Sequence, residues 1–200
     1  MRSVICVFVV LCLGSAALWA GTDGFRAFTS EQARRLAVRS APRSLPTVKL
    51  EDQDAARFSL AEYRGRRVLV DFIYTRCPSV CGVLGATFQR LAGEIADRGP
   101  DGPILISISF DPDADTPAAL KAYADRYHAD GRIWRVARVA DKAALAPMLR
   151  SFGVIVIADA FGGFQHNAAI HLVDERGKLA AIFGYDEAEL AIVAAAANEP

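Results

Sequence analysis

The hydrophobic positions from residue 57 onward switch repeatedly between two periods, and this alternation predicts an α/β domain. Continuous runs of β-branched and aromatic residues at 66–74 and 103–111 indicate strands that are buried on both faces. Apolar residues at helical spacing follow each run and predict helices over 78–99 and 115–129. The result is a strand–helix–strand–helix order, which is typical of parallel strands joined by crossover helices.

The C-terminal third of the chain adds strands of another kind. Two runs at 166–174 and 178–185 are separated by Glu175-Arg176-Gly177, which predicts an antiparallel hairpin. The remaining segments read as an edge strand (57–60), a strand (133–139), a helix with Pro147 as a flaw inside it (141–153), an apolar stretch that becomes loop-like (154–164) and a closing helix (186–199). Together these elements predict a thioredoxin-like α/β sandwich with a mixed central sheet.

The first 22 residues have a different character. Arg2 is the only charged residue before Asp23, and the uncharged stretch between them has about the 20 residues that a membrane span needs. Residues 1–22 are therefore predicted to be a transmembrane anchor or a signal peptide, and we favour a retained anchor with Arg2 inside. Residues 23–44 would form a tether with a short helix, and 45–200 the thioredoxin-like domain. The domain would then face an exported, oxidising compartment, at the periplasmic face of the cytoplasmic membrane.

Charge changes this picture little. The chain has 23 basic and 23 acidic residues, so no basic excess points to a nucleic-acid partner. Cys6 and Cys12 lie in the apolar N-terminal stretch and are read as ordinary apolar residues of it.

The exported part of the chain holds two cysteines, in the stretch DFIYTRCPSVCG. Pro78 suits a first helical turn, so Cys77 is expected near the helix N-terminus, where the helix dipole and Arg76 favour a thiolate. Cys81 follows one turn later on the same face. Two converging soft thiolates suit Cu(I), and a third, nitrogen ligand would also suit Cu(II). Structural zinc needs a fourth protein ligand, and no further cysteine is available.

The nitrogen ligand must come from three histidines. His166 follows the loop FGGFQ, begins the strand expected at 166–174, and would arrive beside the cysteine-bearing helix tip in a thioredoxin-like sheet. We therefore expect Cys77, Cys81 and His166 to be the metal ligands. His128 ends a helix and is read as a solvated histidine that the helix dipole favours. His171 lies inside a strand and is read as a partly buried, hydrogen-bonded residue.

At these residues the chain resembles the SCO/SenC family of copper-binding, thioredoxin-like proteins, over roughly residues 45–198. The stretches DFIYTRCPSVC, ISISFDPDADTP and H…LVDERGKLAAIFG carry the resemblance, in that order. The resemblance implies one copper held by Cys77, Cys81 and His166. It also implies a role in assembling the binuclear copper site of cytochrome c oxidase, by delivering copper to the copper-bearing subunit or by redox preparation of that site. Other copper carriers or thiol-disulfide proteins would be further partners.

The chain also departs from that family. Gln165 and Asn167 flank His166 where family members commonly carry an acidic residue and Ser or Thr, and Gly82 follows Cys81 where many have proline. These departures affect the support of the histidine rather than the ligands themselves. Asp159, in the preceding loop, is a candidate for the missing acidity.

Other readings stay open at this point. Cys77 and Cys81 could act as a redox pair able to form a disulfide, in an exported thiol-disulfide oxidoreductase acting on partner cysteines. A peroxide-handling enzyme is a second alternative, since related sheets host reactive cysteines. Three acidic residues in DPDADTP resemble a cation loop, but the glycine and final glutamate of a calcium loop are missing. Asp111 is instead expected to end a strand, and Asp115 or Thr116 to cap a helix.

Overall fold

The structure is a computed structural model that describes residues 2–77, 80–99 and 102–197, with the backbone alone at 2, 80, 81 and 98. The chain divides into two compact units, Met1–Ala41 and Pro42–Pro200. The first contains α1 (Arg2–Gly21), which includes a stretch at Ser3–Gly21 that is long and apolar enough to cross a membrane. It also contains α2 (Ser30–Ser40), whose N-cap Thr29 accepts a hydrogen bond from the backbone N–H of Gln32. The expected tether helix therefore forms.

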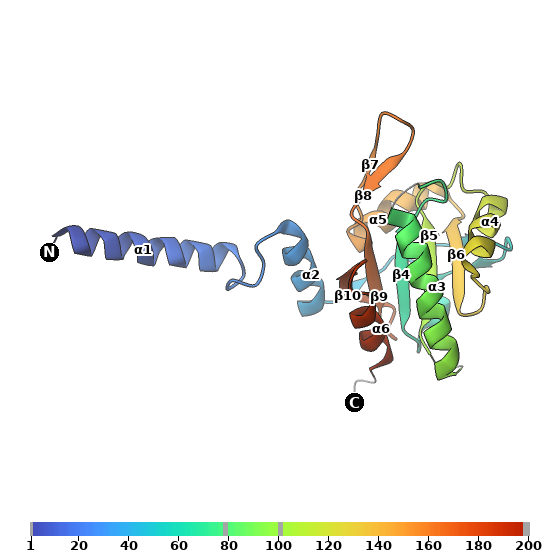
Figure 1. Cartoon of the computed structure of the whole chain (residues 1–200), viewed down its shortest axis with the longest axis horizontal. Helices are drawn as coiled ribbons and strands as arrows, with labels where there is room; N and C mark the ends of the chain where they lie inside the picture. Colours follow the sequence, from blue (N-terminus) through green and yellow to red (C-terminus); the bar gives the residue numbers. More distant parts are fainter. Residues whose placement is uncertain (1, 78–79, 100–101, 198–200) are drawn as a thin grey trace. The chain divides into compact units, whose positions relative to one another are not determined.

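The second unit is a mixed sheet with helices on both faces (Figure 1). Its strands run in the order β1-β10-β9-β4-β5-β6-β2-β3. Strands β4, β5 and β6 are parallel to one another, whereas β9 is antiparallel to β4, as is β10 to β9. The strands are β1 (Arg43–Ser44), β2 (Leu50–Asp52), β3 (Arg57–Phe58), β4 (Val68–Ile73), β5 (Ile104–Ser109), β6 (Trp134–Val139), β9 (Ala169–Val173) and β10 (Lys178–Gly184). The predicted α/β sandwich with a mixed sheet is confirmed.

In the described part of the second unit, four α-helices pack on this sheet. In Figure 1, α3 and α6 lie over one face, while α5 lies behind the other. They are α3 (Val80–Arg98), α4 (Pro117–Tyr127), α5 (Leu145–Phe152) and α6 (Ala188–Ala196), with short 3-10 helices η1 (Leu60–Tyr63) and η2 (Lys142–Ala144). Phe88 of α3 contacts Trp134 of β6 at 5.8 Å between ring centroids, and Phe152 of α5 contacts Phe72 of β4 at 5.1 Å. Every residue of β4 and β5 is buried, as their apolar runs predicted.

Three local expectations need correction. Pro147 is not a flaw inside a helix, because η2 ends before it and α5 begins at Leu145, which leaves Pro147 in a first turn that needs no N–H from it. The strand expected at 166–174 is two strands: β8 (Phe164–His166) ends at the histidine, and β9 begins at Ala169. The stretch 154–164, expected to be apolar and then loop-like, has a strand in its apolar part: β7 (Val156–Ala158) pairs with β8 in a separate antiparallel hairpin. This hairpin projects beyond the main sheet in Figure 1.

A carboxyl group lies inside the sheet face that α3 covers. Asp71 of β4 is 0% exposed and pairs in register with Ser107 of β5, whose hydroxyl accepts a hydrogen bond from the Trp134 indole at 2.9 Å. Burial raises the pKa of Asp71 to about 7, and the Ser107 hydroxyl opposes this rise only in part. Neither carboxyl oxygen has a hydrogen-bond partner of normal geometry among the described residues. The apolar pattern of β4 did not reveal this acid.

Candidate metal centre

The segment that leads to Cys77 is held by a buried carboxylate. Asp115 is 0% exposed, and its Oδ2 accepts hydrogen bonds from the Thr75 backbone N–H at 3.0 Å and the Ser109 hydroxyl at 2.5 Å. Its Oδ1 accepts a third from the Thr75 hydroxyl at 2.6 Å. Three hydrogen-bond donors compensate this carboxylate for the hydration that it loses on burial. Because the donors belong to Thr75 and Ser109, the carboxylate links the chain after β4 to the end of β5. Thr116, not Asp115, caps α4.

The loop after β5 also contacts the residues that follow β4 and end at Cys77 (74–77, the cysteine segment) through an ion pair. Arg76 contacts Asp111 at 2.8 Å, and this hydrogen bond raises the pKa of the guanidinium. The sequence suggested that Arg76 would lend positive charge to Cys77. The structure shows that Asp111 offsets part of that charge. A turn hydrogen bond from the Cys77 N–H to the Tyr74 carbonyl, at 3.2 Å, then fixes the backbone at the cysteine.

An aromatic cluster joins this sheet edge to the β7–β8 hairpin. Tyr74 follows β4 and Phe110 follows β5, and both are buried. Their rings contact Phe164 of β8 at 5.3 and 5.6 Å between centroids, and Phe110 contacts the His166 ring at 5.0 Å. The Tyr74 hydroxyl also accepts from the Phe164 N–H at 3.3 Å and lies 3.4 Å from its carbonyl. These contacts hold the hairpin against Tyr74, which precedes Cys77 by three positions in the chain.

The environment of His166 suits a neutral imidazole. The side chain is half-buried against Phe110, and this burial lowers its pKa, because the charged form loses hydration there. Neutral imidazole is the form that binds a metal.

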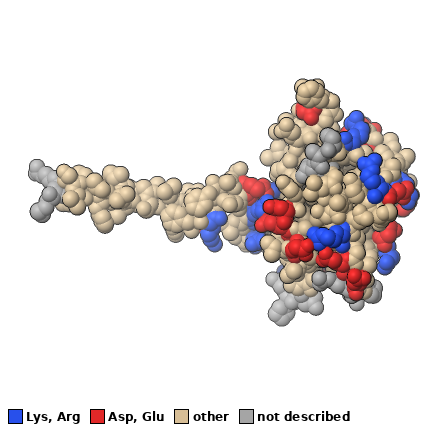
Figure 2. All heavy atoms as spheres, in the orientation of Figure 1, with Lys and Arg blue, Asp and Glu red and all other residues tan. Residues whose placement is uncertain are grey.

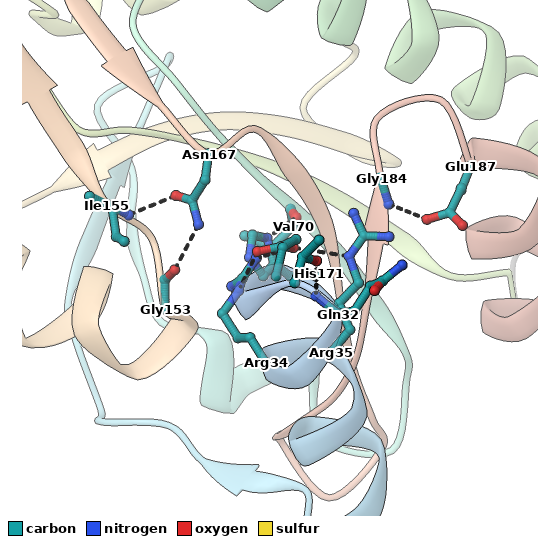
Figure 3. A network of polar contacts seen from close by, with 12 residues as sticks. Gln32, Arg34, Arg35, Val70, Gly153, Ile155, Asn167, His171, Gly184 and Glu187 are labelled. Carbon is teal, nitrogen blue, oxygen red and sulfur yellow. Dashed lines mark hydrogen bonds and ion pairs between the residues drawn. The ribbon is translucent and has the colours of Figure 1, made fainter. Parts of the chain in front are cut away.

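The flanking residue Asn167 has a defined structural role (Figure 3). Its Oδ1 accepts from the Ile155 N–H at 2.7 Å, and its Nδ2 donates to the Gly153 carbonyl at 3.0 Å. These bonds close the base of the hairpin directly beside His166. Asp159, considered as a source of acidity, accepts from the N–H groups of Phe161 and Gly163 and so forms the hairpin turn.

The set of predicted ligands is only partly visible. Cys77 and His166 are described, whereas the side chain of Cys81 lies outside the described residues, as do Pro78 and Ser79. Among the side chains that the structure describes, no three His, Cys, Asp or Glu residues form a group that could hold a metal. The joint geometry of the three predicted ligands therefore stays a prediction.

The other two histidines fit structural roles. His171 is 1% exposed, and its Nδ1 lies 3.2 Å from the Val70 carbonyl (Figure 3). Its ring lies edge-on to the rings of Phe72 and Phe152. His128 is exposed and ends α4 in the left-handed conformation, with φ of 59°.

Comparison with known proteins places this site in a family context. The family model SCO1/SenC matches residues 39–199. The SCO1 protein homolog of Bacillus subtilis is 29% identical over 131 residues, which cover 64% of this chain and 67% of that protein. For two other curated relatives, the putative copper-binding protein of Stutzerimonas stutzeri and a SCO2-like protein of Rickettsia typhi, the matched part spans 43% and 39% of their length.

Two of the solved structures that share the fold illustrate the similarity. One is ScoI of Bradyrhizobium japonicum with copper bound, 27% identical with a TM-score of 0.58, covering 76% of this chain and 97% of that one. The other is BsSco, described as having a disulfide switch and as a member of the Sco family of cytochrome c oxidase assembly proteins. It is 25% identical with a TM-score of 0.66, covering 78% of this chain and 94% of that one. These matches confirm the thioredoxin-like architecture expected from the sequence. Because the SCO1/SenC family model matches residues 39–199, which are most of the globular unit, the chain belongs to the SCO1/SenC family.

Proposed function

We propose that this protein is a copper carrier of cytochrome c oxidase assembly, which binds one copper ion through Cys77, Cys81 and His166. The observation that carries the proposal is the contact of the His166-bearing hairpin with Tyr74 and Phe110. This contact brings an imidazole to the sheet edge from which the cysteine segment leaves. Copper-bound and oxidase-assembly relatives in the same family support the choice of metal and process.

The two thiolates would supply soft donors that favour Cu(I), while the imidazole would add the nitrogen donor that Cu(II) also accepts. A site built from three protein ligands leaves copper open to exchange with a partner. The copper-bearing subunit of cytochrome c oxidase would receive the ion, or have its cysteines reduced in preparation for it. The apolar helix Ser3–Gly21 would hold the carrier at the periplasmic face of the membrane.

Copper binding tests the proposal directly. The full chain, reduced and in detergent, would be mixed with Cu(I), and bound metal would be measured by elemental analysis and by competition with a Cu(I) chelator. We expect one copper per chain, with much weaker binding after Cys77→Ala, Cys81→Ala or His166→Ala. His128→Ala is the matched control and should bind as the unchanged protein does. Equal retention of copper by all variants would remove the proposal.

A thiol-disulfide oxidoreductase is the second candidate, and the placement of Cys77 in the wall of an open pocket favours it. The two candidate functions differ in whether they require His166. Reduction of a partner disulfide should survive His166→Ala and be abolished by either cysteine change, whereas copper delivery should require all three residues.

A further inference from the structure

A pocket opens beside Cys77 between the cysteine segment and α4. Its volume is about 370 Å³, within the size range of small-molecule sites. Thr75, Arg76 and Cys77 form one wall. None of the lining residues that the structure describes belongs to the β7–β8 hairpin, so this space is separate from the side of the site where His166 arrives.

Helix α4 supplies the opposite wall through one face. Ala119, Ala122, Tyr123 and Arg126 line the pocket, and they lie three or four positions apart on the helix. The short side chains of the two alanines leave the space of the pocket open. Tyr123 is buried, and a Cβ at Gly85 of α3 would meet its hydroxyl at 2.8 Å, so close helix packing holds this wall in place.

The charged groups of the pocket are both positive. Arg76 is balanced by Asp111, whereas the Arg126 guanidinium has no ion pair or hydrogen bond with any residue in the described ranges. The lining contains no acidic side chain among those residues. In the region of α4, Figure 2 shows basic side chains with acidic side chains among them. A carboxylate entering the pocket would therefore meet one balanced and one unbalanced guanidinium, which is the donor type that best matches it.

We propose that this pocket binds small carboxylate-bearing disulfides and thiols, and that Arg126 selects them for exchange with Cys77. The proposal does not depend on copper binding. In the exchange, the Cys77 thiolate attacks one sulfur of the bound disulfide. A new S–S bond forms to Cys77, the S–S bond of the ligand breaks, and its other half leaves as a thiolate. The proton of the Cys77 thiol goes to solvent, and the ligand disulfide is the oxidant.

Three symmetric disulfides of different charge test the selection: dithiodipropionate (anionic), hydroxyethyl disulfide (neutral) and cystamine (cationic). The full chain in detergent would carry Cys81→Ser, so that the mixed disulfide at Cys77 is trapped and its formation can be timed by mass spectrometry. We expect the anionic disulfide to react about 5-fold faster than the cationic one at low salt, after normalisation to their rates with a free thiol. The preference should shrink as salt is added.

Arg126→Glu should reverse this preference and Arg126→Lys should keep most of it. Arg176→Glu is the matched control, because Arg176 is exposed in the turn between β9 and β10 at the other edge of the sheet. It changes the net charge equally and should leave the preference unchanged. An unchanged preference in Arg126→Glu, or an equal shift in both glutamate variants, would overturn the proposal. Because no copper is present, neither result bears on the metal site.

Discussion

The two halves of the candidate site are built in opposite ways. The cysteine segment continues directly from β4, the central strand, and a buried Asp115 with three donors ties it to β5. His166 lies instead on a two-stranded hairpin outside the main sheet, which is held by the Tyr74 cluster and by Asn167. The two halves therefore have separate supports. The scaffold, formed by β4, β5 and Asp115, holds the thiol of Cys77, and the arm, formed by the β7–β8 hairpin, carries the imidazole of His166.

The exposed side chains of the hairpin reinforce this contrast. Ile155, Ile157 and Phe161 are 62%, 61% and 96% exposed, whereas all residues of β4 and β5 are buried. Changes in the scaffold should therefore act on global stability, and changes in the arm should act locally.

The largest expected effect lies in the scaffold and depends on pH. The folded pKa of Asp71 is about 7 and its ordinary value is 3.8. Below pH 4 both states hold the proton. Between pH 4 and 7 only the folded state keeps it, so folding loses stability as pH rises, and above pH 7 the loss is complete. Three pKa units correspond to about 4 kcal/mol. Urea unfolding at pH 4 and pH 8 should show this loss in the unchanged protein and not in Asp71→Asn.

Asp97→Asn serves as the control for this measurement, since Asp97 is exposed on α3. It should keep the full pH dependence. If Asp71→Asn kept it as well, the buried acid would not be its source.

A smaller but still global effect is expected for Asp115→Ala. Loss of a buried carboxylate that accepts three hydrogen bonds leaves the Thr75 and Ser109 donors unsatisfied and should cost about 3 kcal/mol in the free energy of unfolding. Asp113→Ala in the same loop is the control, because its side chain is 68% exposed. Urea denaturation of both variants decides the matter, and equal midpoints would contradict the scaffold half of the comparison.

For the arm, Asn167→Ala should have a local effect of about 1–2 kcal/mol, since it removes the two hydrogen bonds that close the hairpin base. Amide hydrogen exchange should speed up in 155–166 while β4 and β5 remain protected. Copper affinity should fall about 10-fold if the imidazole loses its placement. Gln165→Ala, which changes an exposed neighbour of His166, should leave both measurements unchanged.

The smallest effect is expected for Tyr74→Phe, which keeps the ring contact with Phe164 and removes only the hydroxyl. We expect a loss of about 1 kcal/mol, seen as faster exchange at the Phe164 amide, whose N–H donates to that hydroxyl. If the whole sheet lost protection equally, scaffold and arm would form one cooperative unit and the contrast would fail.

Much of the fold could be predicted from local pattern, and much of the site could not. The runs that became β4 and β5 and the turn at 175–177 depend on near neighbours in sequence, so periodicity found them. The burial of Asp71 and Asp115 depends on which elements cover them, and no local pattern encodes that. Asp115 looked like a helix cap because capping needs only a neighbouring turn, whereas its partners are Thr75 and Ser109.

The hairpin shows the same limit. Its turn residues, Asp159 and two following glycines, are visible in the sequence, but the pattern predicts that the apolar run before them leads into a loop. The two-residue break between β8 and β9 carries no strong turn signal, so both strands were joined in one prediction. Cys77 and Cys81 stood out because their chemistry is carried by residue type and spacing alone.

The pairing of the central strand sets an order of events during synthesis. One edge of β4 pairs with β9. In this pairing Val70 lies opposite His171, which follows it by 101 positions in the chain. Until that later segment emerges, the thiols of the growing chain follow a strand that has one unpaired edge. Nascent chains halted before residue 169 should therefore require a chaperone or aggregate, and the thiols meet their surroundings well before the folded sheet can form around them.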